Sequence, residues 1–176
     1  EGKVTYSVDY GTGSGAIDKN GFLRATQVGT LWVKAIKEGD ADYNETESEA
    51  KVITVNQAQI SVTVSKRTIR VGDAVPQLTS SDYVIRGLVN GDHMQKNPTL
   101  SYASTPNTSR TGSVVIQASG AEVPTGGNYQ SEVQYTQGRL TITEQPSYAI
   151  TLRQPEHGTI SSDYSTATEG TVVTLR

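Results

Sequence analysis

Apolar and polar residues alternate along most of this chain, and this alternation constrains its fold more than any other feature. Thr, Val, Ile and Tyr recur with period two, while Gly, Asn, Asp and Pro interrupt the pattern at short intervals. No stretch shows the 3.6-residue period of an amphipathic helix. Short strands at this spacing are typical of sandwiches and barrels, so the sequence predicts an all-β fold.

The same pattern predicts where the strands and turns lie. The expected strands cover residues 3–9, 22–26, 30–36, 50–55, 60–65, 68–71, 83–86, 99–103, 113–119, 133–135, 139–143, 148–153 and 171–175. A hairpin turn is expected at 18–21, because the closing Gly21 supplies the positive φ that a tight turn requires. Residues 28–30 and 136–138 are predicted as two further hairpin tips.

Composition excludes several classes of function. The chain has 176 residues, a formal net charge of −3 and no Cys. A nucleic-acid binder needs clustered Lys and Arg, but the basic residues here are scattered, so no nucleic-acid partner is expected. Without Cys there is no disulfide scaffold, thiol catalysis or Cys-ligated zinc. No apolar run approaches the roughly 18 residues that span a bilayer, so no membrane span is expected in this fragment.

Two junctions divide the chain into three segments. Residues 55–60 hold neither Gly nor Pro, so one domain's last strand is expected to lead almost directly into the next domain's first. Pro146 marks the second junction. The predicted domains are 1–56, 57–145 and 146–176, and the middle one has the size of an immunoglobulin-like sandwich. We therefore expect tandem immunoglobulin-like β-sandwich modules, of which the two terminal ones are incomplete.

The first segment contains three characteristic motifs: Gly-Lys-Val-Thr-Tyr-Ser-Val at 2–8, Ala-Ile-Asp-Lys-Asn-Gly-Phe-Leu-Arg-Ala-Thr at 16–26, and Gly-Thr-Leu-Trp-Val-Lys-Ala at 29–35. Through these motifs it resembles a bacterial Ig-like (Big) domain. The similarity covers nearly all of residues 1–56 and corresponds to the second half of that family's pattern. The family's first strands have no counterpart here.

The other two segments resemble further modules of bacterial surface proteins. Residues 57–145 are similar to MBG-type Ig-related domains, through Gly-Leu-Val-Asn-Gly-Asp at 87–92, Asn128-Tyr129 and Gly-Arg-Leu-Thr-Ile at 138–142. Residues 146–176 are similar to the start of an internalin-type B repeat, through Glu-His-Gly-Thr-Ile at 156–160 and Glu-Gly-Thr-Val-Val-Thr-Leu at 169–175. These resemblances imply a bacterial protein that is secreted or held at the cell surface, and they imply no catalysis.

One loop has the composition of a calcium site. Asp40, Asp42 and Asn44 alternate along a short polar stretch, and alternating oxygen ligands on a tight loop can hold Ca²⁺. The EF-hand glycine and its bidentate glutamate are missing. Asp and Asn also favour turns, where they accept hydrogen bonds from their own backbone, and we favour that interpretation over calcium. No other cofactor is expected.

Three aromatic residues are candidates for ligand binding. Trp32 lies on the opposite side of its strand from Leu31 and Val33, so it faces outward if those two are in the core. It then either packs on a neighbour or stacks on a sugar ring. Tyr43 and Tyr129 each follow a polar turn before a closing strand. We interpret them as corner tyrosines of a sandwich, with binding to a ligand as the alternative.

No residue set predicts an enzyme. His93 and His157 are the only histidines, and neither has a companion at metal or triad spacing. Ser14 lies in a glycine-rich loop rather than in a Gly-x-Ser-x-Gly elbow. The leading hypothesis is therefore a structural spacer, whose partners are the neighbouring domains of the same protein. The alternatives are an adhesive module that binds host glycans, mucins or proteins, and pairing between chains through the strand edges at 3–9 and 171–175.

Overall fold

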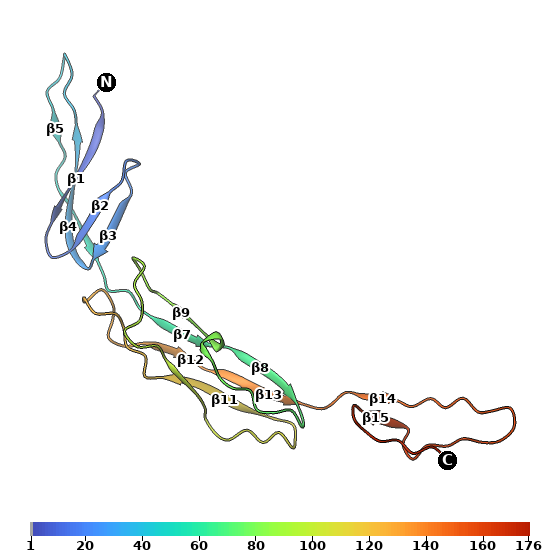
Figure 1. Cartoon of the computed structure of the whole chain (residues 1–176). Coiled ribbons are helices and arrows are strands. Elements are labelled where there is room, and N and C mark those ends of the chain that lie inside the picture. The colour runs from blue at the N-terminus through green and yellow to red at the C-terminus, as the bar shows by residue number, and fades with distance from the viewer. Residues whose placement is uncertain (1) are drawn as a thin grey trace. The chain divides into compact units, whose positions relative to one another are not determined.

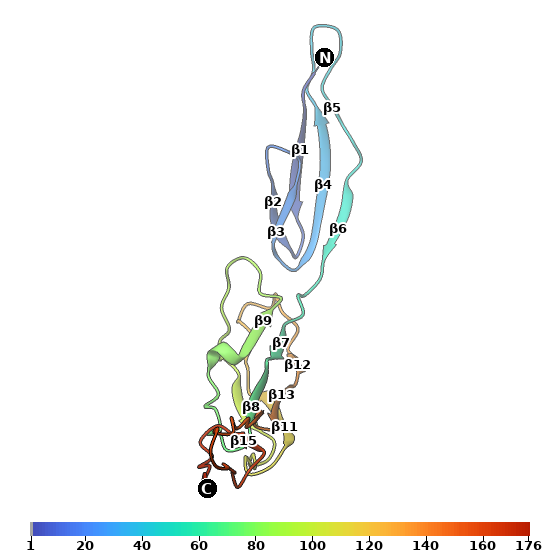
Figure 2. The same cartoon turned by 90° about the vertical axis from the view of Figure 1, so that its right-hand side faces the viewer.

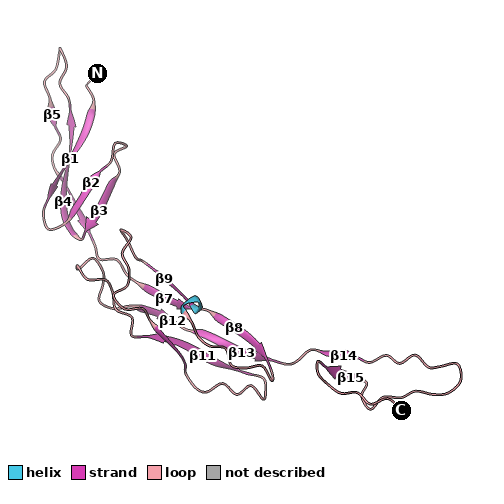
Figure 3. Cartoon of the chain, in the orientation of Figure 1, coloured by secondary structure: helices cyan, strands magenta, loops and turns pink. Residues whose placement is uncertain are grey.

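The computed structural model describes residues 2–176, and within them the chain is nearly all β (Figures 1 and 3). The elements are β1 Val4–Tyr10, β2 Ser14–Ile17, β3 Leu23–Gln27, β4 Gly29–Lys37, β5 Thr46–Glu47, β6 Lys51–Val55, β7 Ser61–Val64, β8 Lys66–Arg70, the 3-10 helix η1 Ser80–Asp82, β9 Tyr83–Arg86, β10 Thr99–Tyr102, β11 Gly112–Ser119, β12 Gln134–Thr136, β13 Gly138–Thr143, β14 Ser147–Ala149 and β15 Thr166–Thr168. The expected all-β fold is confirmed, and it is consistent with immunoglobulin-like sandwich modules.

The chain divides into two compact units. The first contains residues 1–63, 83–99 and 118–136, and the second contains residues 64–82, 100–117 and 137–176. The first unit holds the sheet β1-β4-β5 with β6 also paired to β4, the pair β2-β3, and the sheet β12-β7-β9. The second holds the sheet β10-β11-β13-β8 and the pair β14-β15.

Strand β4 organises the first sheet. It pairs antiparallel with β1 from Tyr10↔Leu31 to Val4↔Lys37, and antiparallel with β6 from Gly29↔Val55 to Val33↔Lys51. Figure 2 shows β4 between these two strands. Leu31 is completely buried, and it is the only large side chain of residues 2–56 in that state. The core of this part of the chain is therefore thin.

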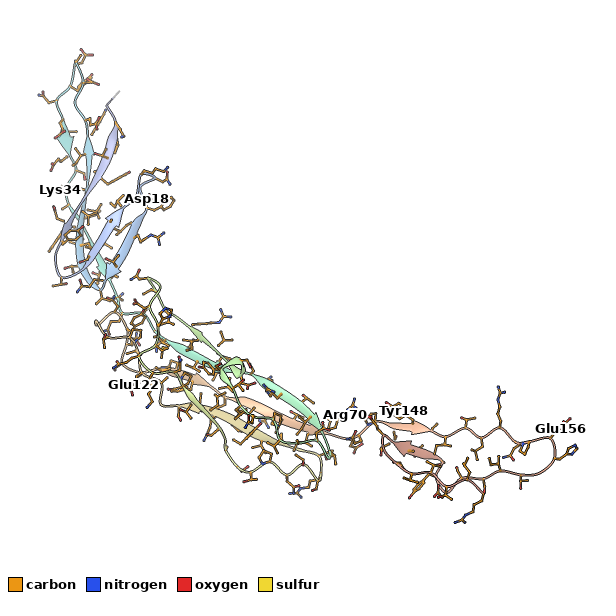
Figure 4. The ribbon with its side chains drawn as sticks, in the orientation of Figure 1. Asp18, Lys34, Arg70, Glu122, Tyr148 and Glu156 are labelled. Atoms are coloured by element: carbon orange, nitrogen blue, oxygen red, sulfur yellow. The ribbon has the colours of Figure 1, made fainter. Side chains whose placement is uncertain are left out.

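The hairpin expected at 18–21 is confirmed. Ile17 pairs with Leu23, and the N–H of Gly21, whose φ is +85°, donates to the carbonyl of Asp18 at 3.0 Å. The Asp18 carboxylate accepts from the N–H groups of Asn20 and Phe22, which holds the turn closed (Figure 4). The first strand of this hairpin, β2, was missed by the pattern because Gly15 takes the place of an alternating side chain.

The two other predicted hairpin tips are wrong. Strands β3 and β4 do not pair with each other, since β3 pairs with β2 and β4 belongs to the sheet of β1 and β6. Strands β12 and β13 likewise belong to different sheets. At both places a glycine lets the chain change sheets. Gly29 has φ +129°, and a Cβ on Gly138 would collide with the carbonyl oxygen of Ser65.

The buried side chains of the middle segment lie on a few strands. In the first unit, β7 pairs in parallel with β12, and both Ile60 and Val62 are fully buried. In the second unit, β13 pairs antiparallel with β11 and in parallel with β8. Leu140 of β13 and Ile116 of β11 are fully buried there. Parallel pairing needs long connections between strands, which period-two patterns do not reveal.

The last segment has little regular structure. Of the strand expected at 148–153 only Ser147–Ala149 forms, paired with Thr166–Thr168, which was not predicted. The strand expected at 171–175 is wrong, because only Leu175 makes an isolated bridge, to Ser162. No residue from 143 to 176 is buried. A two-stranded ribbon without a packed face has little to hold it extended, which explains the missing strand.

Candidate functional site

The loop of the calcium hypothesis is held by its own first aspartate. Asp40 Oδ1 accepts hydrogen bonds from the N–H groups of Asp42 and Tyr43, both at 3.0 Å, and the Asp40 N–H donates to the Tyr43 carbonyl at 2.8 Å. This is the local geometry of an Asx turn. Asp42 and Asn44 are exposed. Across residues 2–176, no three His, Cys, Asp or Glu side chains gather where they could hold a metal ion.

Trp32 faces outward, as the sequence predicts. In the register of the first sheet it lies between Asp9 of β1 and Val52 of β6, on the face opposite Leu31. Its ring packs close over Gly11, where an added Cβ would collide with it, yet 37% of the residue remains exposed. Trp32 is therefore partly packed on its own module and partly available to a ligand.

The two tyrosines differ sharply in exposure. Tyr43 lies at the β4–β5 loop and is 74% exposed. Tyr129 is only 4% exposed, and its hydroxyl accepts from the Val89 N–H at 3.0 Å and donates to Asp92 Oδ2 at 2.8 Å. Burial raises the pKa of Tyr129. Its hydroxyl is thus engaged within the protein, so of the three candidate aromatic residues only Trp32 and Tyr43 expose their rings.

An ion pair between the partly exposed Arg67 and the buried Asp82 was not found by sequence reasoning. Asp82, at the end of η1, is 2% exposed, and its carboxylate accepts from the Arg67 Nε–H and from the Thr79 N–H, the latter at 2.7 Å. The Arg67 hydrogen bond lowers the pKa of Asp82, and the same bond raises the pKa of Arg67. Thr-x-x-Asp at 79–82 is a local capping signal that could have indicated the aspartate, but nothing local indicates an arginine 15 residues away.

Further hydrogen bonds hold the segment that contains this ion pair. The Ser65 N–H donates to the Asp82 carbonyl at 2.8 Å, which ties η1 to the residue between β7 and β8. Six residues before Asp82, the Pro76 carbonyl accepts a hydrogen bond from the Tyr102 hydroxyl at 2.8 Å, and burial raises the pKa of Tyr102. All of these contacts are made within the second unit. We therefore assign the pair to the stability of the second unit.

Two of the cavities contain no histidine, aspartate or glutamate. In the first unit a cavity of about 220 Å³ is lined by apolar side chains, including Val28, Val55 and Val89, and by as many uncharged polar ones, and none of its lining residues titrates. In the second unit a cavity of about 300 Å³ is lined mostly by small polar residues, with Arg110 as its charged side chain. His93 and His157 are both exposed and lie outside these cavities.

Within the part of the chain that the structure describes, no helix is long and apolar enough to cross a membrane. No curated protein matches the chain. The family model of the MBG domain (YGX type) matches residues 60–141. This match confirms the resemblance of the middle segment, while the Big and B-repeat resemblances of the flanking segments stay predictions. What is established is that residues 60–141, a little under half of the chain, are similar to MBG domains of the YGX type.

Proposed function

We propose that this chain is a non-catalytic structural part of a bacterial cell-surface or secreted protein. In this proposal, successive β modules at 1–56, 57–145 and 146–176 space a distal domain from the cell envelope. The match of residues 60–141 to the MBG domain supports it, since MBG domains are typically found in extracellular surface proteins.

The observation that carries the proposal is that the buried polar side chains form their hydrogen bonds within the protein. Among the described residues, every buried side-chain nitrogen or oxygen has a hydrogen-bond partner within the protein. Asp82 is held by Arg67 and Thr79, and Tyr129 by Val89 and Asp92. Active sites leave polar groups aimed at a substrate, whereas these groups are satisfied internally. That is the arrangement expected of a structural module.

Contacts inside the first unit also support a spacer. Asn128 accepts from the Val28 N–H at 3.0 Å and donates to the Thr26 carbonyl at 3.1 Å. The Asn90 side chain donates to the same carbonyl at 3.3 Å. Together with the short stretch 55–60, these bonds limit hinge motion between residues 1–56 and the segment that follows.

An adhesive module is the second candidate, and the exposed Trp32 and Tyr43 favour it. An exposed indole or phenol ring can stack on the C–H face of a sugar. Because Trp32 is the only tryptophan, its fluorescence emission reports on anything that covers it. Titration with host glycans, mucin fragments and matrix proteins should shift that emission only if this face binds a ligand.

Binding of the intact chain to an array of glycans, mucins and matrix proteins distinguishes the two candidates. A spacer should show no saturable binding, in calcium or in EDTA. Saturable binding that Trp32→Ala abolishes, and that the exposed control Phe22→Ala retains, would overturn the spacer and establish the adhesive module. If EDTA abolished the binding and Asp40→Asn reproduced that loss, the loop at Asp40, Asp42 and Asn44 would be a calcium site.

A further inference from the structure

Positive charge gathers on one sheet of the second unit. Strands β8, β10, β11 and β13 form this sheet, and none of them contains Asp or Glu. They contain Lys66, Arg67, Arg70 and Arg139 instead. Arg139 lies far from the other three in the sequence, and the parallel pairing of β8 with β13 brings it beside them (Figure 1). The whole chain has a formal net charge of −3, so this sheet is a local exception.

The strand register divides these cations between the two faces of the sheet. Arg139 pairs directly with Lys66, so their side chains share a face. Arg70 follows Lys66 by four residues on the same strand and points the same way. Leu140 and Arg67 point to the opposite face, where Leu140 is fully buried. Lys66, Arg70 and Arg139 are exposed, and we call their side of the sheet the basic face.

No carboxylate neutralises the basic face within the described residues. None of the ion pairs of residues 2–176 involves Lys66, Arg70 or Arg139. Asp73 and Glu144 lie just beyond the ends of β8 and β13. The Asp73 carboxylate accepts from the backbone N–H of Arg70 at 2.8 Å and forms no ion pair with its guanidinium. Like charges directly opposite each other destabilise a sheet, so the Lys66–Arg139 pair is unfavourable until an anion approaches it.

Uncharged hydrogen-bonding side chains occupy much of the rest of the basic face. Thr68 pairs with Thr141 between the cations, and Ser113 pairs with Thr141 from the other side. The Arg139 guanidinium donates to the Ser113 hydroxyl at 2.8 Å, which holds it toward β11. A surface of cations and hydroxyls suits a ligand that carries both negative charges and hydroxyl groups.

The cavity of about 300 Å³ in the second unit adjoins the basic face. Ser113, which binds Arg139, also lines this cavity, together with Ser104 and Thr105. Arg110 lines it as well and is exposed. The cavity therefore extends the basic face past the end of β11 with one further cation and more hydroxyl groups.

We propose that the basic face binds an anionic polysaccharide, whose sulfate or carboxylate groups neutralise Lys66, Arg139 and Arg70. Arg70 is four residues along the strand from Lys66, about 13 Å away, so one small anion cannot contact both. A polymer with repeated charges can, and the second contact then strengthens the first. A nucleic acid also supplies charge, but proteins hold single strands on aromatic platforms, which the strands of this face do not present.

This binding role goes beyond that of a spacer, which needs no ligand. It is also separate from the adhesive candidate, because Trp32 and Tyr43 belong to the first unit, whereas Lys66, Arg70 and Arg139 belong to the second. Failure of the proposal would leave the spacer standing, since the radius of gyration that tests the spacer does not depend on these side chains.

Dextran sulfate and neutral dextran of the same length test the proposal on the intact chain, because the two polymers differ only in their sulfate groups. Calorimetric titration at low salt should show saturable binding of dextran sulfate and none of dextran. Raising the ionic strength from about 0.01 M to about 0.15 M shortens the Debye length from about 30 Å to about 8 Å, and should weaken the binding roughly tenfold or more. Absence of binding to dextran sulfate, or equal binding of neutral dextran, would overturn the proposal.

Two triple variants of equal net charge locate the binding. The first combines Lys66→Gln, Arg70→Gln and Arg139→Gln, and should bind dextran sulfate roughly tenfold or more weakly, because it loses charge-assisted hydrogen bonds. The control removes three exposed cations of the first unit and should keep its affinity; it combines Arg24→Gln, Lys37→Gln and Lys51→Gln. Equal losses in both variants would mean that the polymer responds to net charge alone, and would overturn the proposal.

The single variant Lys66→Gln separates ligand binding from a structural role. A lysine that served the fold would lower the Tm when replaced. Because Lys66 lies opposite Arg139, its replacement should instead leave the Tm unchanged or raise it, while the binding of dextran sulfate weakens. A lower Tm together with unchanged binding would contradict the proposal.

A single-stranded oligonucleotide of the same total charge as the dextran sulfate tests the choice of polymer. The oligonucleotide should bind more weakly, since the basic face offers hydroxyl groups and no stacking platform. Tighter binding of the oligonucleotide would make this a nucleic-acid surface and would overturn the assignment to a polysaccharide.

Discussion

The Tyr129 hydroxyl donates a 2.8 Å hydrogen bond to the Asp92 carboxylate, across 37 residues of sequence. It also accepts from the Val89 N–H, so that a single buried side chain secures the loop at 87–92. The loop needs such support, since Gly87, Asn90 and Gly91 all adopt positive φ. A non-glycine residue at positive φ is strained unless its surroundings hold it there.

Replacing Tyr129 with Phe should destabilise this part of the chain by about 1–3 kcal/mol, because the Val89 N–H and the Asp92 carboxylate lose a partner in a partly buried setting. Tyr135→Phe is the matched control. Its hydroxyl accepts from the Ala121 N–H, but the residue is 38% exposed and water can take over that bond. The control should cost less than about 0.5 kcal/mol. Urea unfolding monitored by circular dichroism measures both, and equal effects would contradict the assigned role of Tyr129.

The Asp82 carboxylate should give the chain a stability that is lost in acid. Its pKa in the folded protein lies below its ordinary value of 3.8, chiefly because Arg67 donates a hydrogen bond to it. The stabilisation is therefore complete above about pH 5, declines as the pH falls through the unfolded pKa, and is lost once the pH is below the folded pKa and the folded carboxylate also takes up its proton. Asp82→Asn should remove this dependence and cost about 1–3 kcal/mol at pH 7.

Thermal unfolding between pH 2 and 7 measures that difference. The exposed Asp42→Asn is the control and should follow the unmodified chain at every pH. If Asp82→Asn melted like the unmodified chain at pH 7, the ion pair would contribute nothing to stability.

Truncating Leu31 should unfold the first module, because it is the one large side chain of residues 2–56 that is wholly buried. Leu→Ala changes in cores cost about 2–5 kcal/mol. Trp32 is next to it in the chain, and as the sole tryptophan it reports on this module alone. Tryptophan emission should show a large drop in the urea midpoint for Leu31→Ala. Val52→Ala, at a residue 59% exposed, should leave the midpoint nearly unchanged.

Gly138 should not tolerate a methyl group. A Cβ there would collide with the Ser65 carbonyl and crowd the Val64 side chain at 2.8 Å. Gly138→Ala should therefore cost about 1–3 kcal/mol, as overpacking does. Gly112→Ala is the control, because its Cβ would meet nothing within 4 Å and its φ is not positive. It should be neutral or slightly stabilising in the same chemical unfolding experiment.

The sequence predicted individual strands better than it predicted their partners. Period-two alternation placed strands such as Tyr83–Arg86 and Gly112–Ser119 closely, because alternation reflects burial of one face. Turns at Gly29 and Gly138 looked like hairpin tips, but the chain changes sheets there. Glycine supplies the required backbone freedom in both cases, so local sequence cannot separate a hairpin from a crossover.

For the candidate site residues, too, the direction of a side chain on its own strand could be predicted, whereas its tertiary partner could not. The outward direction of Trp32 followed from the alternation on its own strand, and the structure places it so. The partner of Asp82 could not be predicted, because Arg67 reaches it only through tertiary packing.

The most direct test of the spacer is the radius of gyration of the intact chain, from small-angle X-ray scattering at low concentration. A single compact globule of 176 residues would have a value of about 16 Å, and an unfolded chain about 44 Å. Tandem modules in a row should give a value clearly between the two, with the scattering profile of folded domains. A value near 16 Å would mean that the modules fold back on one another, and would contradict the spacer.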